Sequence, residues 1–423
     1  MTSTEQSPLW LLLLIHVPSP TSLANFRSLY AQPLVESLEK LSQITKSTSV
    51  IQTLDIIIPC PGLKDDVPRS AQYTDLQDVI CQLYRLLCVI CTEHSIGVEN
   101  GNDVEIRIIP LGVDTGSSEM QAGKTSPSTS TLSLASTSDS RLLASCQRPW
   151  KRLLVVKDEG GSLVDTLLQD RMTSGQQAFQ ALTLGKGHPG TAISDSKQNS
   201  TQESRGRRDQ LSRHYSVAVG GTFDHLHAGH KLLLTMTAFV LEPHGQGKHG
   251  RQRALTIGIT GDKLLEKKKC VEELQDWDQR LDGVRTFLSA ILMLDAPDRA
   301  LLSTKPTMDP DSGARTVRDD YKSDLVINYV EIFDPFGPTI TDEEISALVV
   351  SAETRSGGKT VNDRRSEKDW AAVEIFEVAV LNAGNDNDPR SDSPMEHDFQ
   401  NKISSTAIRQ KLQLRHGRGT AMT

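Results

Sequence analysis

The amino-acid sequence predicts an α/β protein: a parallel-sheet domain in the C-terminal half, preceded by a smaller α/β region. Two observations favour this class. Apolar, β-branched runs alternate with segments of helical periodicity along both halves. A Gly-Gly pair at residues 220–221 also joins one such run to a helical pattern. In the N-terminal half we expect strands at residues 10–17, 54–58, 104–109 and 153–156, and helices at 24–45 and 74–93.

The alternation is stronger in the C-terminal half. There we expect strands at residues 215–219, 255–259, 325–332, 347–351 and 377–381, and helices at 227–240, 278–294, 368–376 and from residue 406. Strands separated by helices form parallel sheets that are covered on both faces. Ligands bind beyond the carboxyl ends of such strands, so we expect the chemistry in the loops that follow them.

Composition divides the chain of 423 residues, which is long enough for two or three domains. We expect an N-terminal α/β region at 1–184, a linker at 185–213 and a second domain at 214–423. Large apolar residues nearly vanish at 114–140, which predicts a disordered Ser/Thr-rich insert because such a segment cannot bury enough surface. Residues 303–320 and 382–400 have similar compositions, and we expect irregular surface insertions there.

Charge and cysteine content exclude several classes of protein. A formal net charge of -8 disfavours nucleic acid as a partner. Six cysteines are too few for a secreted disulfide framework, so we expect thiols and a cytoplasmic location. Cys88 and Cys91 have CxxC spacing without a second pair, and their apolar surroundings predict buried thiols. The apolar run at residues 10–15 is too short for a membrane span.

The most informative segment is VAVGGTFDHLHAGHKLLL, at residues 217–234. Its glycines allow a sharp turn, and the helix that follows offers free N–H groups and a positive dipole end suited to phosphate. His227 and His230 are three residues apart, so they share one helix face and can donate hydrogen bonds to one phosphate chain. A single histidine is more often an ordinary surface residue, but the combination favours a phosphate site.

A second segment, KISSTAIR at residues 402–409, has Ser and Thr at the start of a helix. Its hydroxyls and exposed N–H groups are suited to phosphate, although Ser405 or Thr406 alone would be a simple N-cap.

These two segments resemble the GTFDxLHxGH and ISSTxIR-type motifs of the HxGH nucleotidylyltransferases. Members of this family transfer a nucleotidyl group from a nucleoside triphosphate to a phosphate-bearing acceptor. The resemblance implies a Rossmann-like C-terminal domain in which Thr222, His227 and His230 are catalytic. It implies ATP contacts from Gly221, Phe223, His227, His230, Glu353, Ser404, Ser405, Thr406 and Arg409.

Further segments are similar to the phosphopantetheine adenylyltransferases of the eukaryotic and archaeal type, in particular fungal monofunctional ones. They are ITGDKLLEKKK at 259–269, WDQR at 277–280, DPFGPT at 334–339 and the SAETRSGGKTVNDRR stretch at 351–365. The resemblance runs from Tyr215 to about Leu414. It implies ATP and 4'-phosphopantetheine as substrates, with Mg²⁺ arriving on ATP and no metal site built by the protein. It implies phosphopantetheine contacts from Thr222, Lys268, Arg280 and Arg365, although exposed Lys and Arg are more often plain surface charges.

Two alternatives remain open. A cytidylyltransferase acting on a phospho-alcohol shares the first motif, but such relatives carry RTxGIS where this chain has Asn401-Lys-Ile-Ser. A non-catalytic scaffold would keep the fold and use residues 1–205 to bind other enzymes of coenzyme A synthesis.

Overall fold

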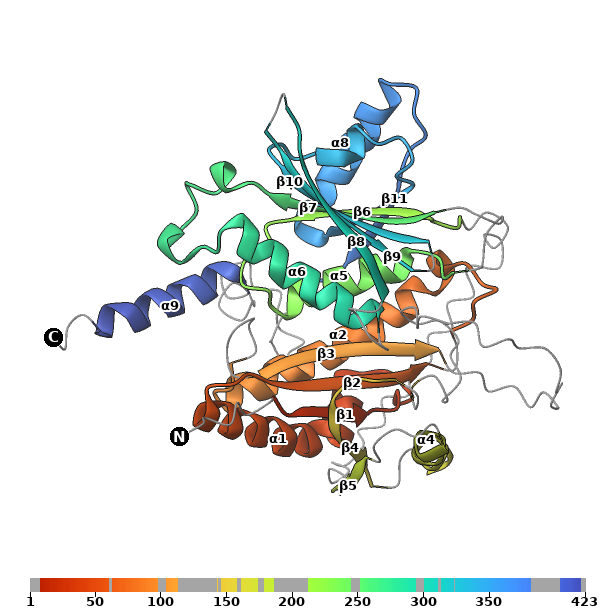
Figure 1. Ribbon diagram of the computed structural model, residues 1–423, viewed down its shortest axis with the longest axis vertical. Helices are drawn as coiled ribbons and strands as arrows, with labels where there is room; N and C mark the ends of the chain where they lie inside the picture. The colour runs from red at the N-terminus through yellow and green to blue at the C-terminus, as the bar shows by residue number, and fades with distance from the viewer. Residues whose placement is uncertain are drawn as a thin grey trace, which may run out of the picture.

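The computed structural model describes residues 8–60, 63–97, 104–112, 143, 146–157, 161–173, 179–185, 212–244, 252–293, 300–310, 313–322, 324–381 and 404–419. Within these ranges the chain forms two sheets, one from each half of the sequence (Figure 1). The predicted inserts at 114–140 and 382–400 lie outside the described residues, as do positions 186–211 of the predicted linker.

The N-terminal half folds into a parallel sheet with the strand order β3-β2-β1-β4-β5. Strand β2 is buried along its whole length, as expected of an apolar run covered on both faces. The strands and helices predicted for this half are present, and α4 and β5 are additional. The elements are β1 (Trp10–Leu14), α1 (Leu23–Thr48), β2 (Gln52–Cys60), α2 (Arg69–Glu93), β3 (Val104–Gly112), β4 (Trp150–Val156), α4 (Gly161–Thr173) and β5 (Gln180–Leu184).

The C-terminal sheet has the strand order β12-β11-β6-β7-β10-β9-β8. Strands β12, β11, β6, β7 and β10 run parallel, and β9 and β8 extend the sheet in antiparallel fashion. The predicted α/β class is therefore confirmed. The strands are β6 (Ser216–Gly221), β7 (Arg253–Thr260), β8 (Leu301–Met308), β9 (Arg315–Tyr321), β10 (Leu325–Ile332), β11 (Ala347–Ser351) and β12 (Glu374–Val378). The helices are α5 (Ala228–Val240), α6 (Trp277–Leu292), α8 (Arg355–Ser366) and α9 (Ser405–Gly419).

The segment 303–320, expected to be an irregular insertion, instead lies within the hairpin of β8 and β9. Charged side chains hold the hairpin: the Arg285 guanidinium contacts both carboxylate oxygens of the fully buried Asp319, at 2.6 and 2.7 Å. Strands held by charge pairs at a sheet edge carry little apolar pattern, which is why composition misjudged this segment.

The helix predicted at 368–376 is also wrong. Residues 374–378 form β12, which pairs with β11, and the helix at this place is α8, over 355–366. Helix α8 is strongly polar and contains Gly357 and Gly358, so it has almost no apolar periodicity to detect.

The two halves pack closely together. Helix α2 contacts α5, and α6 lies against β3 (Figure 1). Lys231 of α5 is 2% exposed, and its Nζ donates to Glu105 Oε2 at 2.9 Å and to the Ile106 carbonyl oxygen at 3.1 Å. Arg148, before β4, donates to the carbonyl oxygen of Ala290 on α6. A single apolar core extends through both halves, so the N-terminal sheet supports two helices of the C-terminal half.

Two expectations about chain type have outcomes here. No helix within the described ranges is long and apolar enough to cross a membrane. No disulfide joins any two cysteines among the described residues, and Cys88 and Cys91 are buried in α2, as predicted for thiols within an apolar helix.

Candidate active site

A cleft of about 930 Å³ opens at the carboxyl ends of the parallel strands in the C-terminal sheet. Strand β6 pairs with β7 on one side and with β11 on the other, so the chain reverses its winding direction beside β6. Open α/β sheets bind ligands at such a switch point. The cleft is lined by residues from the loop between β6 and α5, the loop after β10, the end of β11, the start of α8 and the first turn of α9.

The loop between β6 and α5 has a strained backbone. Phe223 and His225 adopt left-handed conformations with φ of 53° and 45°, which cost residues other than glycine about 1–3 kcal/mol each. Two hydrogen bonds hold His225: its backbone N–H donates to Gln275 Oε1 at 2.7 Å, and its Nε2 lies 2.7 Å from the Glu273 carbonyl oxygen. The loop is therefore fixed by the segment before α6.

The Phe223 side chain packs beneath the loop, on the side away from the cleft. Its ring is 1% exposed and does not line the cleft, so its side chain makes no part of the surface available to ATP. Gly221 does line the cleft, and a Cβ there would lie 3.0 Å from the Phe223 ring. Glycine at this position lets the loop turn tightly over the ring.

The two histidines lie side by side at the start of α5. Their rings stack with centroids 3.9 Å apart, and both line the cleft. His227 is the N-cap of the helix, and its Nδ1 accepts a hydrogen bond from the Gly229 N–H at 3.2 Å. An imidazole whose Nδ1 accepts carries its proton on Nε2, so Nε2 of His227 is left as a donor. A Cβ on Gly229 would lie 3.1 Å from the His227 ring, which shows how closely the ring packs on the helix.

His230 is held in a less polar environment. Its ring packs on Phe223, with centroids 5.5 Å apart, and its Nδ1 is buried with no hydrogen-bond partner among the described residues. Burial lowers the pKa of His230 to about 3. The ring is only partly buried on the cleft side, so a bound anion there would stabilise the protonated form and oppose this shift.

Asp224 joins the histidine loop to two other segments. Its fully buried carboxylate accepts hydrogen bonds from the Arg409 guanidinium and from the Gln275 N–H, the latter at 3.0 Å. Its backbone carbonyl accepts from Ser405 Oγ at 2.8 Å. Asp224 is absent from the predicted site residues, although its place shortly before His227 and His230 was a usable signal.

The first turn of α9 also lines the cleft, through Ser404, Ser405, Thr406 and Arg409. Ser404 Oγ accepts from the Ala407 N–H at 3.3 Å and so caps the helix. The buried Arg409 guanidinium donates hydrogen bonds to the Asp224 carboxylate, to Thr406 Oγ1 at 3.2 Å and to the Lys269 carbonyl at 3.0 Å. Neither α5 nor α9 has an acidic residue in its first turn, so two positive helix ends meet the cleft uncancelled.

Other predicted contacts divide between the cleft and the interior. Thr222, Lys268 and Glu353 line the cleft. Arg280 does not: it is 1% exposed and donates to the Thr222 carbonyl at 2.8 Å, the Gln275 carbonyl at 3.0 Å and Asp262 Oδ1 at 2.5 Å. It therefore positions Thr222 from behind and does not contact phosphopantetheine in this arrangement.

Arg365 is placed away from the cleft, contrary to its predicted role. It is 1% exposed, and its five N–H groups donate to five backbone carbonyls at 2.7–3.1 Å. These belong to Thr339, Asp342, Glu343, Ile345 and Ala371. A saturated guanidinium has nothing left for a phosphate, so Arg365 ties α8 to the loop before β11.

Comparison with known proteins agrees with this geometry. Residues 218–411 match the model of a family described as cytidylyltransferase-like. The C-terminal half is a cytidylyltransferase-like domain. Residues 1–185 match a second family model, described as a domain of unknown function.

Several relatives are similar to about half of this chain. A phosphopantetheine adenylyltransferase of Saccharomyces cerevisiae is 33% identical over 214 residues, which cover 51% of this chain and 53% of the relative. One of Pyrobaculum aerophilum is 26% identical over 198 residues, 47% of this chain and 92% of the relative. An uncharacterized protein of Schizosaccharomyces pombe is 34% identical over 195 residues, 46% of this chain and 47% of the relative. The chain thus spans about half the length of the two fungal relatives.

Proposed function

We propose that this chain is a pantetheine-phosphate adenylyltransferase, which transfers AMP from ATP to 4'-phosphopantetheine and yields dephospho-coenzyme A and pyrophosphate. One observation carries the proposal. The histidine loop and the first turn of α9, far apart in sequence, are joined through Asp224 at one cleft between two helix N-termini. Such a cleft suits a chain of phosphates, and two of the relatives named above are phosphopantetheine adenylyltransferases.

The chemical step needs positioning more than proton transfer. An oxygen of the acceptor phosphate attacks the α-phosphorus of ATP, a new P–O bond forms, and the bond to the β-phosphate oxygen breaks to release pyrophosphate. The nucleophile is already an anion at neutral pH, so no general base is required. Catalysis then rests on alignment of the two phosphates and on donors aimed at the developing charge.

The residues of the cleft divide this work. Thr222, held by Arg280 through its carbonyl, would orient the acceptor phosphate, and Lys268 would balance its charge. Nε2 of His227 would donate to the transferred phosphate, with His230 stacked beside it. The hydroxyls of Ser404 and Thr406 would donate to the β- and γ-phosphates, and Ser405, whose hydroxyl proton goes to the Asp224 carbonyl, would contribute its backbone N–H at the start of α9.

The nucleoside end of ATP would lie toward the end of β11, where Glu353 lines the cleft. We expect Mg²⁺ to arrive on ATP, held mainly by phosphate oxygens and water. One carboxylate of the lining, Asp334, fits this role as an oxygen ligand, because Mg²⁺ usually keeps several waters and takes one or two carboxylates. Asp334 Oδ1 also accepts from two backbone N–H groups, at 2.7 and 2.8 Å, and so bends its own loop.

Pyrophosphate release tests the proposal. ATP with 4'-phosphopantetheine should release pyrophosphate, whereas CTP with phosphocholine should not. Replacing His227 or His230 by alanine should lower turnover by about 10²- to 10³-fold, the usual loss for one donor to developing charge. The exposed His244 offers a matched control, and His244→Ala should leave turnover unchanged.

Release with the CTP pair would instead indicate a cytidylyltransferase. No release with either pair, from folded protein that still binds ATP, would leave the scaffold as the better account. Binding of other coenzyme A-synthesising enzymes by the N-terminal half stays a prediction, which co-purification of purified candidates with the full chain would check.

A further inference from the structure

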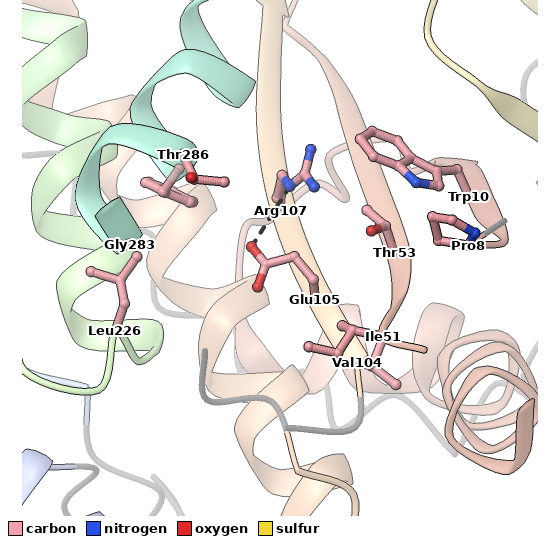
Figure 2. A pocket seen from close by; sticks show the side chains of 11 residues that line it. Pro8, Trp10, Ile51, Thr53, Val104, Glu105, Arg107, Leu226, Gly283 and Thr286 are labelled. Atoms are coloured by element: carbon pink, nitrogen blue, oxygen red, sulfur yellow. Dashed lines mark ion pairs between the residues drawn. The ribbon is translucent and has the colours of Figure 1, made fainter. Parts of the chain in front are cut away.

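A second cavity, of about 250 Å³, lies between the N-terminal sheet and helix α6 (Figure 2). Three strands of that sheet form one wall, and α6 with the loop before α5 forms the other (Figure 2). The residues that line it include Trp10, Thr53, Glu105, Arg107, Leu226 and Thr286. Residues from the N-terminal half and from the cytidylyltransferase-like domain therefore both form the walls of this cavity.

Strand register explains why polar side chains meet there. Trp10 pairs with Thr53 and Thr53 with Glu105, so these three form one row across the sheet. Asp55 pairs with Arg107 in a neighbouring row, two residues further along, where side chains point to the same face. The face covered by α6 thus carries buried charges where an apolar layer would be ordinary.

These charges do not balance. Glu105 bonds Lys231 at 2.9 Å, and Asp55 bonds Arg148 at 2.7 Å. Arg107 is left with the same two carboxylates at 3.6 and 3.7 Å, beyond ordinary hydrogen-bond distance. Three cations therefore face two carboxylates in this cluster.

The surplus cation is Arg107. It is 6% exposed, and its guanidinium lies 4.7 Å from the centre of the Trp10 ring. No residue in the described part of the chain accepts a hydrogen bond from it, yet it lines the cavity. Its ion-pair partners among the described residues are these two carboxylates, which Lys231 and Arg148 bond more closely, and an oxyanion in the cavity is the partner that its planar fork matches.

We propose that this cavity is a regulatory binding site for a small organic carboxylate. The excess of one positive charge matches a monoanion, whereas a phosphate monoester would bring a charge nearer to -2. Ile51, Val104, Leu226 and Phe287 supply apolar walls for the body of the ligand. At about 30 Å³ per water-sized group, a cavity of 250 Å³ holds a molecule of roughly eight heavy atoms.

Occupancy of the cavity bears directly on the active cleft. Leu226 is a wall of the cavity and stands between His225 and His227 in the loop. Glu105 is another wall, and it anchors Lys231, the residue after His230. A ligand in the cavity therefore changes the free energy of the histidine loop and with it the affinity of the cleft for ATP. By linkage, bound ATP changes the affinity of the cavity for its ligand by the same factor.

Benzoate is a suitable probe, because it joins a carboxylate to a flat apolar body of the right size. Calorimetric titration of the full chain should show saturable binding of one benzoate per chain at millimolar concentration. Arg107→Gln should weaken binding about tenfold or more, the equivalent of one charge-assisted hydrogen bond. Thr286→Trp should do the same by filling the cavity from the exposed side of α6, without removing a core contact.

Two control variants distinguish this site from others. Arg152→Gln changes an arginine of the same sheet outside the cavity, and Lys268→Ala removes a cation of the active cleft; neither should alter benzoate binding. Saturating benzoate should also shift the dissociation constant for ATP in wild-type protein and not in Thr286→Trp. The proposal is overturned by absence of saturable binding, by binding that survives both cavity variants, by binding lost in Lys268→Ala, or by an unchanged ATP affinity. Benzoate binding is read without turnover, so it is independent of the adenylyl-transfer assay.

Discussion

Replacing Arg365 by methionine should destabilise the protein without touching its active cleft. The substitution removes five charge-assisted hydrogen bonds that Arg365 donates to backbone carbonyls. The bonds to the carbonyls of Thr339 and Ile345 are fully buried. A buried carbonyl left without a donor costs about 1–3 kcal/mol, and the three part-buried ones can rehydrate. We therefore expect the free energy of unfolding to fall by about 3–5 kcal/mol.

Urea unfolding followed by circular dichroism measures this loss, and the neighbouring Arg364 provides the control. Arg364 is over half exposed and pairs with the equally exposed Glu367 at 3.1 Å. Arg364→Met should thus cost at most about 1 kcal/mol. Arg365→Lys should fall between the two, because an ammonium donates fewer bonds and lacks the planar fork.

The active cleft supplies the second readout. Folded Arg365→Lys should keep the wild-type KM for 4'-phosphopantetheine, because Arg365 is not part of the cleft lining. A KM raised tenfold or more with unchanged stability would refute this reasoning and restore the substrate-binding role that the sequence predicted.

Three other perturbations have expected outcomes. Lys231→Met removes the 2.9 Å partner of Glu105 and leaves that carboxylate with Arg107 at 3.6 Å, so it should cost about 1–3 kcal/mol in urea unfolding; Glu105→Gln in the same chain should recover part of this, and a purely additive double variant would contradict the coupling. Gly229→Ala puts a Cβ 3.1 Å from the His227 ring, so pyrophosphate release should slow while the unfolding free energy changes by less than about 1 kcal/mol. The pKa of His230 is lowered to about 3 in the folded state, below its unfolded value of about 6.5. The contribution of the neutral His230 ring to the free energy of unfolding should therefore be fully present above pH 6.5 and be lost as pH falls from 6.5 toward 3. The slope is at most about 1.4 kcal/mol per pH unit, and urea unfolding of His230→Gln between pH 7 and 5 should lack it.

The packing of the two halves changes how the N-terminal region is understood. Its sheet supplies Glu105, the partner of Lys231 on the helix that carries His230, and Arg148, which donates to the end of α6. A deletion of this half would strip those partners and expose part of a shared apolar core. Experiments on activity are therefore best made with the full chain.

Local sequence patterns were enough to predict the fold class and the segments that carry chemistry. Apolar periodicity is a local property, so strands such as β2 and helices such as α5 were predictable from neighbouring residues. The glycine turn with His227 and His230 at helical spacing is local as well, and it indicated a phosphate site. Where local apolar signal was weak, as in the charged hairpin of β8 and β9 and in the polar helix α8, the prediction was wrong.

The role of each charged side chain depends on long-range packing and could not be predicted from neighbouring residues. An arginine in a sequence is equally compatible with a ligand, a surface charge or a buried anchor, because its role depends on which acceptors the fold places around it. Long-range packing surrounded Arg365 with carbonyls and gave Arg409 the carboxylate of Asp224. It placed Arg107 beside a cavity, 3.6 and 3.7 Å from carboxylates that other cations bond more closely, because strand register and the docking of α6 bring together residues from both halves of the chain.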